Sequence, residues 1–207
     1  MSKTRYLRLS VVALAIAVTA LVAMPWPASA QLSGLAGTGS STGTGATALA
    51  ATVLGNTTSL ASTGNLADAY DVLGAELDSG SIPVGSAEVL HATAIGEGDY
   101  VSSEASLADL ALSAGGATVT AAFVMANAAA DSAGGTSGST MVQGLVVNGV
   151  SITPSGAANQ TISLGAIQVV LNEVTQSASG ITVNALHIST SDGFVDVVVA
   201  SASAAIP

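Results

Sequence analysis

Residues 180–202, GITVNALHISTSDGFVDVVVASA, contain two runs rich in β-branched residues on either side of Asp192 and Gly193. Asp-Gly is a preferred two-residue hairpin turn, because the turn whose twist suits the strands needs a positive φ angle at both positions. A hairpin that pivots there pairs Ile188 with Val197. We therefore expect an antiparallel hairpin in the centre of a β-sheet.

The two faces of this hairpin differ in polarity. One face is apolar and consists of Leu186, Ile188, Val195, Val197 and Val199. The other face is half polar and consists of His187, Ser189, Asp196, Val198 and Ala200. A slip of one residue would exchange the faces, so we expect the register to be strongly specified.

The first 30 residues have the organisation of a secretory signal peptide. A positive n-region with Lys3, Arg5 and Arg8 precedes an apolar run at residues 9–22 and an A-x-A cleavage site at residues 28–30. The apolar run is shorter than the roughly 20 residues of a membrane span, and no second run follows. We expect cleavage after residue 30 and export, with an uncleaved signal anchor as the alternative.

Charge and sulfur content restrict the chemistry of the exported chain. All three basic residues lie in the first 30 residues, whereas all 13 acidic residues follow them. Without Lys or Arg nothing would neutralise phosphate groups, so we predict no nucleic-acid binding and no docking on anionic lipid. Lysine Schiff bases are also excluded. The absence of cysteine excludes disulfides, zinc–thiolate sites and cysteine nucleophiles.

The remaining sequence predicts a single β domain behind a leader. Residues 31–47 are rich in Gly, Ser and Thr, and we predict a flexible leader or linker at residues 31–66 and a β-sandwich domain at residues 67–207. A second hairpin is expected around Asn148 and Gly149.

Alternation over the domain predicts its strands and turns. At residues 117–129 it places one set of side chains on a common buried face, namely Val119, Ala121, Phe123 and Met125. We expect a turn at residues 78–81 and a glycine-rich loop at residues 131–139. The whole pattern predicts an all-β fold, an antiparallel β-sandwich of roughly ten short strands.

Several short motifs occur in a fixed order. They are V-N-G at residues 147–149, N-Q-T-I at 159–162, L-N-E at 171–173, T-V-N-A-L-H at 182–187 and a valine-rich run at 195–203. In this order they resemble the bacterial choice-of-anchor P family of secreted proteins, over residues 67–203. The resemblance implies an extracytoplasmic β-rich domain whose activity is not established. Members carry varied C-terminal anchors. No sorting motif or apolar helix follows the last run here, so we expect release or non-covalent retention.

His91 and His187 are the two histidines of the chain. A functional interpretation makes them metal ligands or a general base, and Asp196, diagonal to His187 on the predicted hairpin, could orient it. The alternative is a structural histidine bonded to Asp196 or Ser189. We favour this alternative, because two histidines of unknown proximity do not define a catalytic site. We therefore predict no catalytic residue and no cofactor.

Two groups of carboxylates are candidate Ca²⁺ ligands, because carboxylate oxygens suit this cation. Glu97 and Asp99 lie in a Gly-containing loop, and Asp68 and Asp71 lie near the start of the predicted domain. Neither group matches an EF-hand, so we favour solvated surface acids. The remaining candidate metal ligands are His187 and Asp196.

Asn172, Glu173 and Asn184 lie in the family-like motifs. As buried groups they would hydrogen-bond across strands and fix the sheet, and as exposed groups they could contact a sugar hydroxyl. We expect the structural role.

Three functions are compatible with these observations. The leading hypothesis is a secreted, non-enzymatic β-sandwich with a structural or interaction role at the bacterial cell surface or in the extracellular matrix. The second is self-assembly into a surface fibre, in which the leader and residues 48–54 donate a strand to a neighbour's sheet edge. The third is a Ca²⁺-dependent glycan-binding module or a metal-dependent hydrolase.

Overall fold

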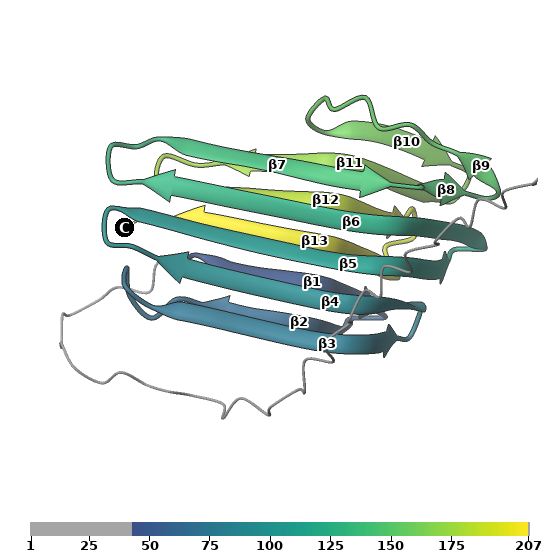
Figure 1. Cartoon of the computed structure of the whole chain (residues 1–207). Helices are drawn as coiled ribbons and strands as arrows, with labels where there is room; N and C mark the ends of the chain where they lie inside the picture. Colours follow the sequence, from purple (N-terminus) through teal and green to yellow (C-terminus); the bar gives the residue numbers. More distant parts are fainter. Residues whose placement is uncertain (1–42, 207) are drawn as a thin grey trace, which may run out of the picture. The chain divides into compact units, whose positions relative to one another are not determined.

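The computed structural model describes residues 43–206, which all belong to one compact unit. These residues form thirteen strands in two antiparallel sheets and contain no helix (Figure 1). The predicted signal peptide and residues 31–42 of the predicted leader lie outside the described residues. Within residues 43–206, no helix is long and apolar enough to cross a membrane. The predicted antiparallel β-sandwich is confirmed, with more strands than the ten expected.

Each sheet consists mainly of consecutive strands. Sheet A contains β1 (Gly45–Val53), β2 (Asn56–Asn65), β10 (Gln160–Leu164), β11 (Ile167–Gln176), β12 (Gly180–Thr190) and β13 (Val195–Ala205). Sheet B contains β3 (Val72–Ile82), β4 (Gly85–Gly96), β5 (Tyr100–Ala114), β6 (Ala117–Asp131), β7 (Thr136–Gln143), β8 (Val146–Val147) and β9 (Val150–Ser151). The strand order is β10-β11-β12-β13-β1-β2 in sheet A and β3-β4-β5-β6-β8-β9 in sheet B, where β7 also pairs with β6.

Strands β1 and β2 correct the predicted domain boundary at residue 66. β1 lies between β13 and β2, with Leu49 opposite both Val199 and Leu60. Residues 45–65 therefore belong to the sandwich and are not a linker. Residues 48–54, which the fibre hypothesis uses as a donated strand, lie in β1 and its turn, and β1 pairs within the chain.

Both predicted hairpins form in the expected register, but the β12–β13 loop spans residues 191–194 and is longer than the predicted two-residue turn. Only Gly193 of its Asp-Gly pair has a positive φ, of 72°. In the β12–β13 hairpin Ile188 lies opposite Val197, and in the β8–β9 hairpin Val147 lies opposite Val150. Two other turns were predicted wrongly. Residues 78–81 lie inside β3, because the chain turns later, at residues 83–84. The loop predicted at residues 131–139 is shorter, because β7 begins at Thr136 and pairs with β6.

A transverse crease interrupts the alternation of side chains in sheet A. The residues on it face each other across neighbouring strands, and they are Ala61, Ala48, Ala200, Ala185 and Asn172. On every second strand the crease residue is left-handed, with φ of 47° at Ala61, 50° at Ala200 and 50° at Asn172. Non-glycine residues rarely adopt this conformation. The crease makes adjacent residues face inward, so Ala200 is fully buried and its assignment to the polar face is wrong.

Sheet B has a matching crease. Its left-handed residues are Val89, Asp109 and Gly144, with φ of 48°, 46° and 63°. On β6 the next buried residue after Ala121 is Val124, three positions later instead of two. The face predicted by strict alternation is therefore wrong beyond Ala121, and both Phe123 and Met125 are only partly buried.

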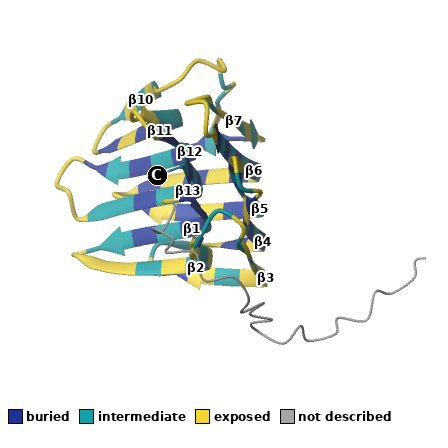
Figure 2. Ribbon diagram, turned by 90° about the vertical axis from the view of Figure 1, so that its left-hand side faces the viewer, coloured by how far each residue is buried: buried dark blue, intermediate teal, exposed yellow. Residues whose placement is uncertain are grey.

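Buried stretches occur on strands of both sheets (Figure 2). The crease of sheet A separates two halves of this core that differ in side-chain size. Toward the β12–β13 turn the buried side chains are bulky and include Leu107, Leu110, Leu186, Ile188 and Val197. Toward the end of β13 they are mostly alanine and include Ala92, Ala94, Ala105, Ala126, Ala128, Ala202 and Ala204. Stacked sheets usually lie about 10 Å apart. Small side chains allow a closer approach here, and Cα atoms of β13 lie within 8 Å of Cα atoms of β5 and β6.

Candidate functional site

The most connected group of polar side chains lies on the outer face of sheet A. We call His187, Glu173, Asn184 and Asp196 the histidine clamp. His187 and Asn184 extend from β12, Glu173 from β11 and Asp196 from β13. The Nδ1 atom of His187 lies 3.0 Å from both carboxylate oxygens of Glu173, and Nε2 lies 2.9 Å from Oδ2 of Asp196. Asn184 Nδ2 donates a 2.7 Å hydrogen bond to Glu173 Oε2.

The crease explains how these residues meet. Inward-facing Ala185 and Leu186 separate Asn184 from His187, so the two outward residues are three positions apart instead of two. Glu173 pairs with Asn184 on one side of the crease, and His187 reaches it from the other side. The clamp therefore bridges the crease and joins three neighbouring strands.

The clamp requires a protonated histidine. A carboxylate accepts hydrogen bonds, so both ring nitrogens of His187 must carry a proton to donate to Glu173 and Asp196. Partial burial by itself lowers the pKa of His187, but the hydrogen bonds to Asp196 and Glu173 and their negative charges outweigh it and raise the pKa. Burial likewise raises the pKa of Glu173, but the hydrogen bonds from Asn184 and His187 outweigh it and leave that pKa below 4.5.

This arrangement leaves little free reactivity. Both nitrogen positions of His187 face carboxylates, so neither offers a lone pair to a metal or a substrate proton. Among residues 43–206, no group of three or more His, Asp or Glu side chains has the geometry of a metal site. His187 and Asp196 lie together, as their diagonal positions indicated. They form a direct hydrogen bond, which corresponds to the structural alternative named above.

The participation of Glu173 was not foreseen. Its predicted structural role, a hydrogen bond to Asn184 across strands, agrees with the structure. The register of β11 against β12 would have revealed its proximity to His187, because the two residues flank the crease on adjacent strands.

His91 lies apart from the clamp, on β4 of sheet B. Its Nε2 atom lies 3.4 Å from Glu76 Oε1 on β3, and this carboxylate side chain is 78% exposed. An exposed ion pair of this kind contributes little to stability. The two histidines therefore do not form a common site.

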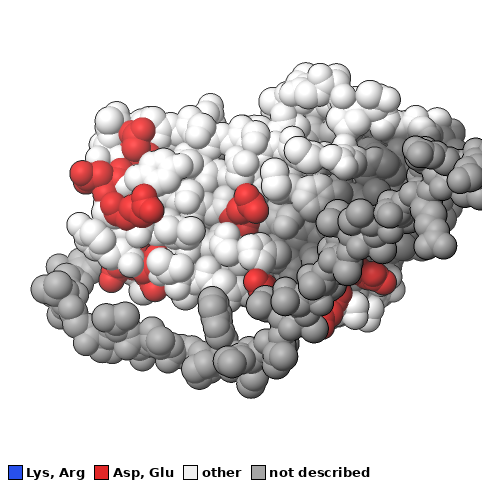
Figure 3. All heavy atoms as spheres, viewed as in Figure 1, with Lys and Arg blue, Asp and Glu red and all other residues white. Residues whose placement is uncertain are grey.

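The four candidate Ca²⁺ ligands lie in two loops that meet at one end of the sandwich. Gly98 N donates to the carbonyl of Ala69, and this hydrogen bond connects the β4–β5 and β2–β3 loops. The side chain of Asp71 accepts hydrogen bonds from the backbone amides of Ala67 and Val72, and that of Asp68 accepts one from Tyr70 N. Acidic side chains also gather at the left end of the face shown in Figure 3. The hydrogen bonds of Asp68 and Asp71 to backbone amides give these two aspartates a role in shaping the β2–β3 loop.

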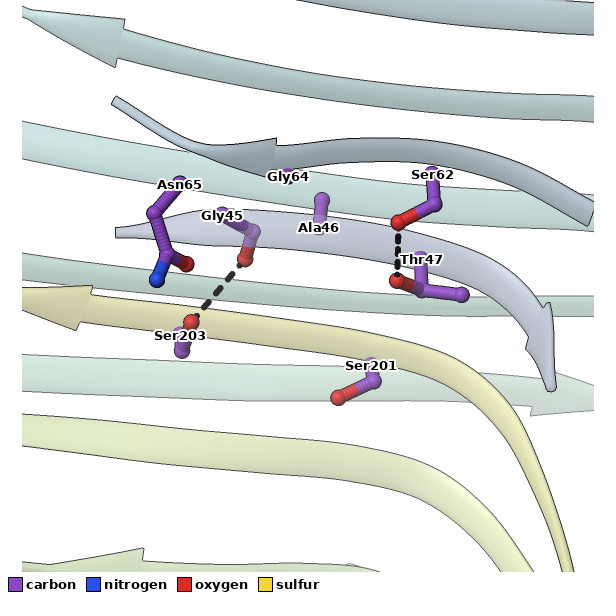
Figure 4. Close-up of a pocket in the computed structure, with 8 residues that line it drawn as sticks. All are labelled: Gly45, Ala46, Thr47, Ser62, Gly64, Asn65, Ser201 and Ser203. Atoms are coloured by element: carbon purple, nitrogen blue, oxygen red, sulfur yellow. Dashed lines mark hydrogen bonds between the residues drawn. The ribbon is translucent and has the colours of Figure 1, made fainter. Parts of the chain in front are cut away.

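Two grooves on the surface of the described residues are shallow. An open groove of about 180 Å³ lies on sheet A where β1, β2 and β13 meet (Figure 4). Within it the hydroxyls of Thr47 and Ser62 share a 2.9 Å hydrogen bond, and Ser203 Oγ donates to the carbonyl of Gly45 at 3.1 Å. A second groove of about 140 Å³ lies between β5, β6 and β7. Ligand pockets for small molecules usually have about 300–1,000 Å³.

The fold and the clamp define a two-sheet antiparallel β-sandwich with a creased sheet and a histidine held between carboxylates. No protein-family model, curated protein or solved structure matches the chain. The resemblance of its motifs to the choice-of-anchor P family stays a prediction.

Proposed function

We propose that this protein is a secreted, non-enzymatic β-sandwich with a structural or interaction role at the bacterial cell surface or in the extracellular matrix. The observation that carries the proposal is the histidine clamp. Its hydrogen-bonding groups face one another across three strands, as suits a group that stabilises a sheet rather than one that receives a substrate. The ordered V-N-G, N-Q-T-I, L-N-E and T-V-N-A-L-H motifs support an extracytoplasmic setting.

The experiment has a localisation arm and an activity arm. Fractionation of the native host, followed by antibody detection, is expected to place the protein in the culture fluid or on intact cells. Chromogenic ester and glycoside substrates are expected to show no turnover with the purified protein. Retention in the cytoplasm would contradict the first part of the proposal.

The activity arm uses His187→Ala with His91→Ala as its matched control. A turnover that His187→Ala abolishes and His91→Ala retains, with unchanged circular dichroism in both variants, would overturn the non-enzymatic role. Calorimetric titration with Ca²⁺ and Zn²⁺ is expected to give flat traces. A saturable heat signal would instead favour the metal-dependent alternative.

A further inference from the structure

The histidine clamp has an unusual charge balance. Residues 43–206 contain no Lys or Arg, so a protonated histidine is the only side-chain cation available there. Glu173 from β11 and Asp196 from β13 both face the imidazole of His187. Without the imidazolium, the two carboxylates would face a neutral ring that can donate only one hydrogen bond.

We propose that the histidine clamp is a pH-operated latch across the crease of sheet A. It is closed while the imidazole of His187 carries two protons and Glu173 is ionised, and it opens when the ring loses a proton or the carboxylate gains one. The opening concerns β11 and the loop before β10, whereas the buried core stays intact.

The segment that the latch holds is otherwise weakly attached. β11 has buried side chains at Ile167, Val169 and Leu171, but residues 172–176 are half-buried or exposed. The main packing contacts of β11 with the strands of sheet B are those with β7, and they are sparse. Beyond its backbone pairing with β12 and its hydrogen bonds to residues 156–159 ahead of β10, this segment is held by Glu173 in the clamp and by Gln176 Nε2, which donates to Thr136 Oγ1 at 3.3 Å.

The same segment supports the loop that leads into β10. Asn172 Nδ2 donates to the carbonyl of Gly156, and Asn159 Oδ1 accepts a hydrogen bond from Val174 N. Opening the latch therefore loosens this crossing between the sheets. Elements with few buried contacts are those that open locally before the core.

The direction of the pH effect follows from the groups that face His187. These are Glu173 on β11, Asp196 on β13 and the neutral Asn184 on its own strand. The pKa of His187 is raised above 6.5, so its stabilising effect is complete below that pH and is lost as the pH rises through the folded-state pKa. The pKa of Glu173 is lowered from 4.5, so its effect is complete above that pH and is lost on acidification. The latch is thus closed between pH 4.5 and 6.5.

Hydrogen exchange of the full chain, measured by NMR and corrected for the intrinsic exchange rate, tests the latch. Protection factors of the amides of residues 172–176 are expected to fall about tenfold between pH 5.5 and pH 8.5, the loss that corresponds to one hydrogen bond to a charged group. Core amides of β6 are expected to change much less. In His187→Gln the same segment should be poorly protected at both pH values, whereas His91→Gln should behave as the wild type.

The ring ¹⁵N shifts of His187 provide a readout that needs no variant. They are expected to show a doubly protonated imidazole at pH 5.5 and its titration above pH 6.5. A neutral ring at pH 5.5 would overturn the proposal, and so would equal protection of residues 172–176 at both pH values. These outcomes do not depend on where the protein is located, so they are separate from the tests of the proposed function.

Discussion

Gly138 on β7 of sheet B lies close against the buried side chains of β12 in sheet A. A Cβ atom added there would overlap Cγ2 of Val183 on β12, lie 3.1 Å from the carbonyl oxygen of Asn127 and lie 3.3 Å from Cδ1 of Ile181. Val183 is fully buried and Ile181 is 5% exposed. The β-branched Val183 is stiff at χ1 and cannot rotate away without meeting its neighbours. We therefore expect Gly138→Ala to destabilise the protein.

A loss of stability in Gly138→Ala would be informative, because Gly→Ala substitutions at unstrained, open positions usually raise stability. Where the backbone is compatible and space is free, Gly→Ala stabilises a protein by about 0.4–1 kcal/mol. Overpacking of a tight core costs about 1–3 kcal/mol. The difference predicts a net loss of about 1–2 kcal/mol for Gly138→Ala, which lowers the Tm of a domain of this size by about 2–8 °C.

Urea unfolding followed by circular dichroism measures the effect. Gly74→Ala is the matched control, because Gly74 lies on edge strand β3 and its nearest atom to an added Cβ is the Ala92 carbonyl oxygen at 4.0 Å. This control is expected to be neutral or slightly stabilising. In the double variant with Val183→Ala the penalty of the alanine at position 138 should largely vanish, with a coupling energy of about 1–2 kcal/mol.

Two results would refute the reasoning about Gly138. One is a Gly138→Ala variant at least as stable as the wild type. The other is an additive double variant, in which removal of the Val183 methyl groups does nothing for the alanine at position 138. Either result would mean that the two sheets are not closely packed at this place.

Three further predictions test other parts of the structure. Leu186→Ala is expected to cost about 2–5 kcal/mol in urea unfolding because the side chain is fully buried, whereas Phe194→Ala, at a position 56% exposed, should stay within about 0.5 kcal/mol of the wild type. Ser103→Ala removes the 2.8 Å hydrogen bond from its buried hydroxyl to a β13 carbonyl, and unfolding should show a loss of about 1 kcal/mol. Thr190→Val removes the main hydrogen bond that lowers the pKa of Asp192, so an NMR titration should find this pKa closer to its ordinary value; an unchanged pKa would contradict the assignment.

Local turn chemistry explains why the hairpins could be predicted. Asp-Gly at residues 192–193 and Asn-Gly at residues 148–149 both favour turns with positive φ. In the structure both residues of the Asn-Gly turn have a positive φ, of 50° at Asn148 and 78° at Gly149, whereas in the Asp-Gly pair only Gly193 has one, of 72°. Once such a turn is placed, the register of the flanking strands follows from counting residues, and this also placed His187 near Asp196.

The crease could not be predicted, because it is a property of the sheet and not of one strand. Strict alternation put Ala200 outside and Phe123 inside, but in the structure Ala200 is fully buried and Phe123 is only partly buried. The sequence of a single strand does not show where the inward-facing and outward-facing positions exchange. The left-handed residues Ala61, Ala200 and Asn172 become recognisable only when neighbouring strands are aligned.

The same reason explains the error at the start of the domain. Residues 45–65 have the Gly, Ser and Thr content of a linker, but small residues are also what the space beside β13 accepts. Ala46, Ala48 and Ala51 are buried there, and β1 completes sheet A by pairing with β13. The composition of a segment gives the size of its side chains, but it does not show whether the folded protein provides a strand for the segment to pair with.

Sequence alone determined that residues 67–206 form antiparallel β-structure with hairpins at two turns, because alternation and turn propensity act between residues close in the chain. It also determined the charge and sulfur chemistry, which depend on composition only. Tertiary structure decided the crease, the membership of β1 and β2 and the meeting of Glu173 with His187 across β11 and β12. These features depend on which strands become neighbours and how closely the sheets pack, and that is settled only when the whole core is assembled.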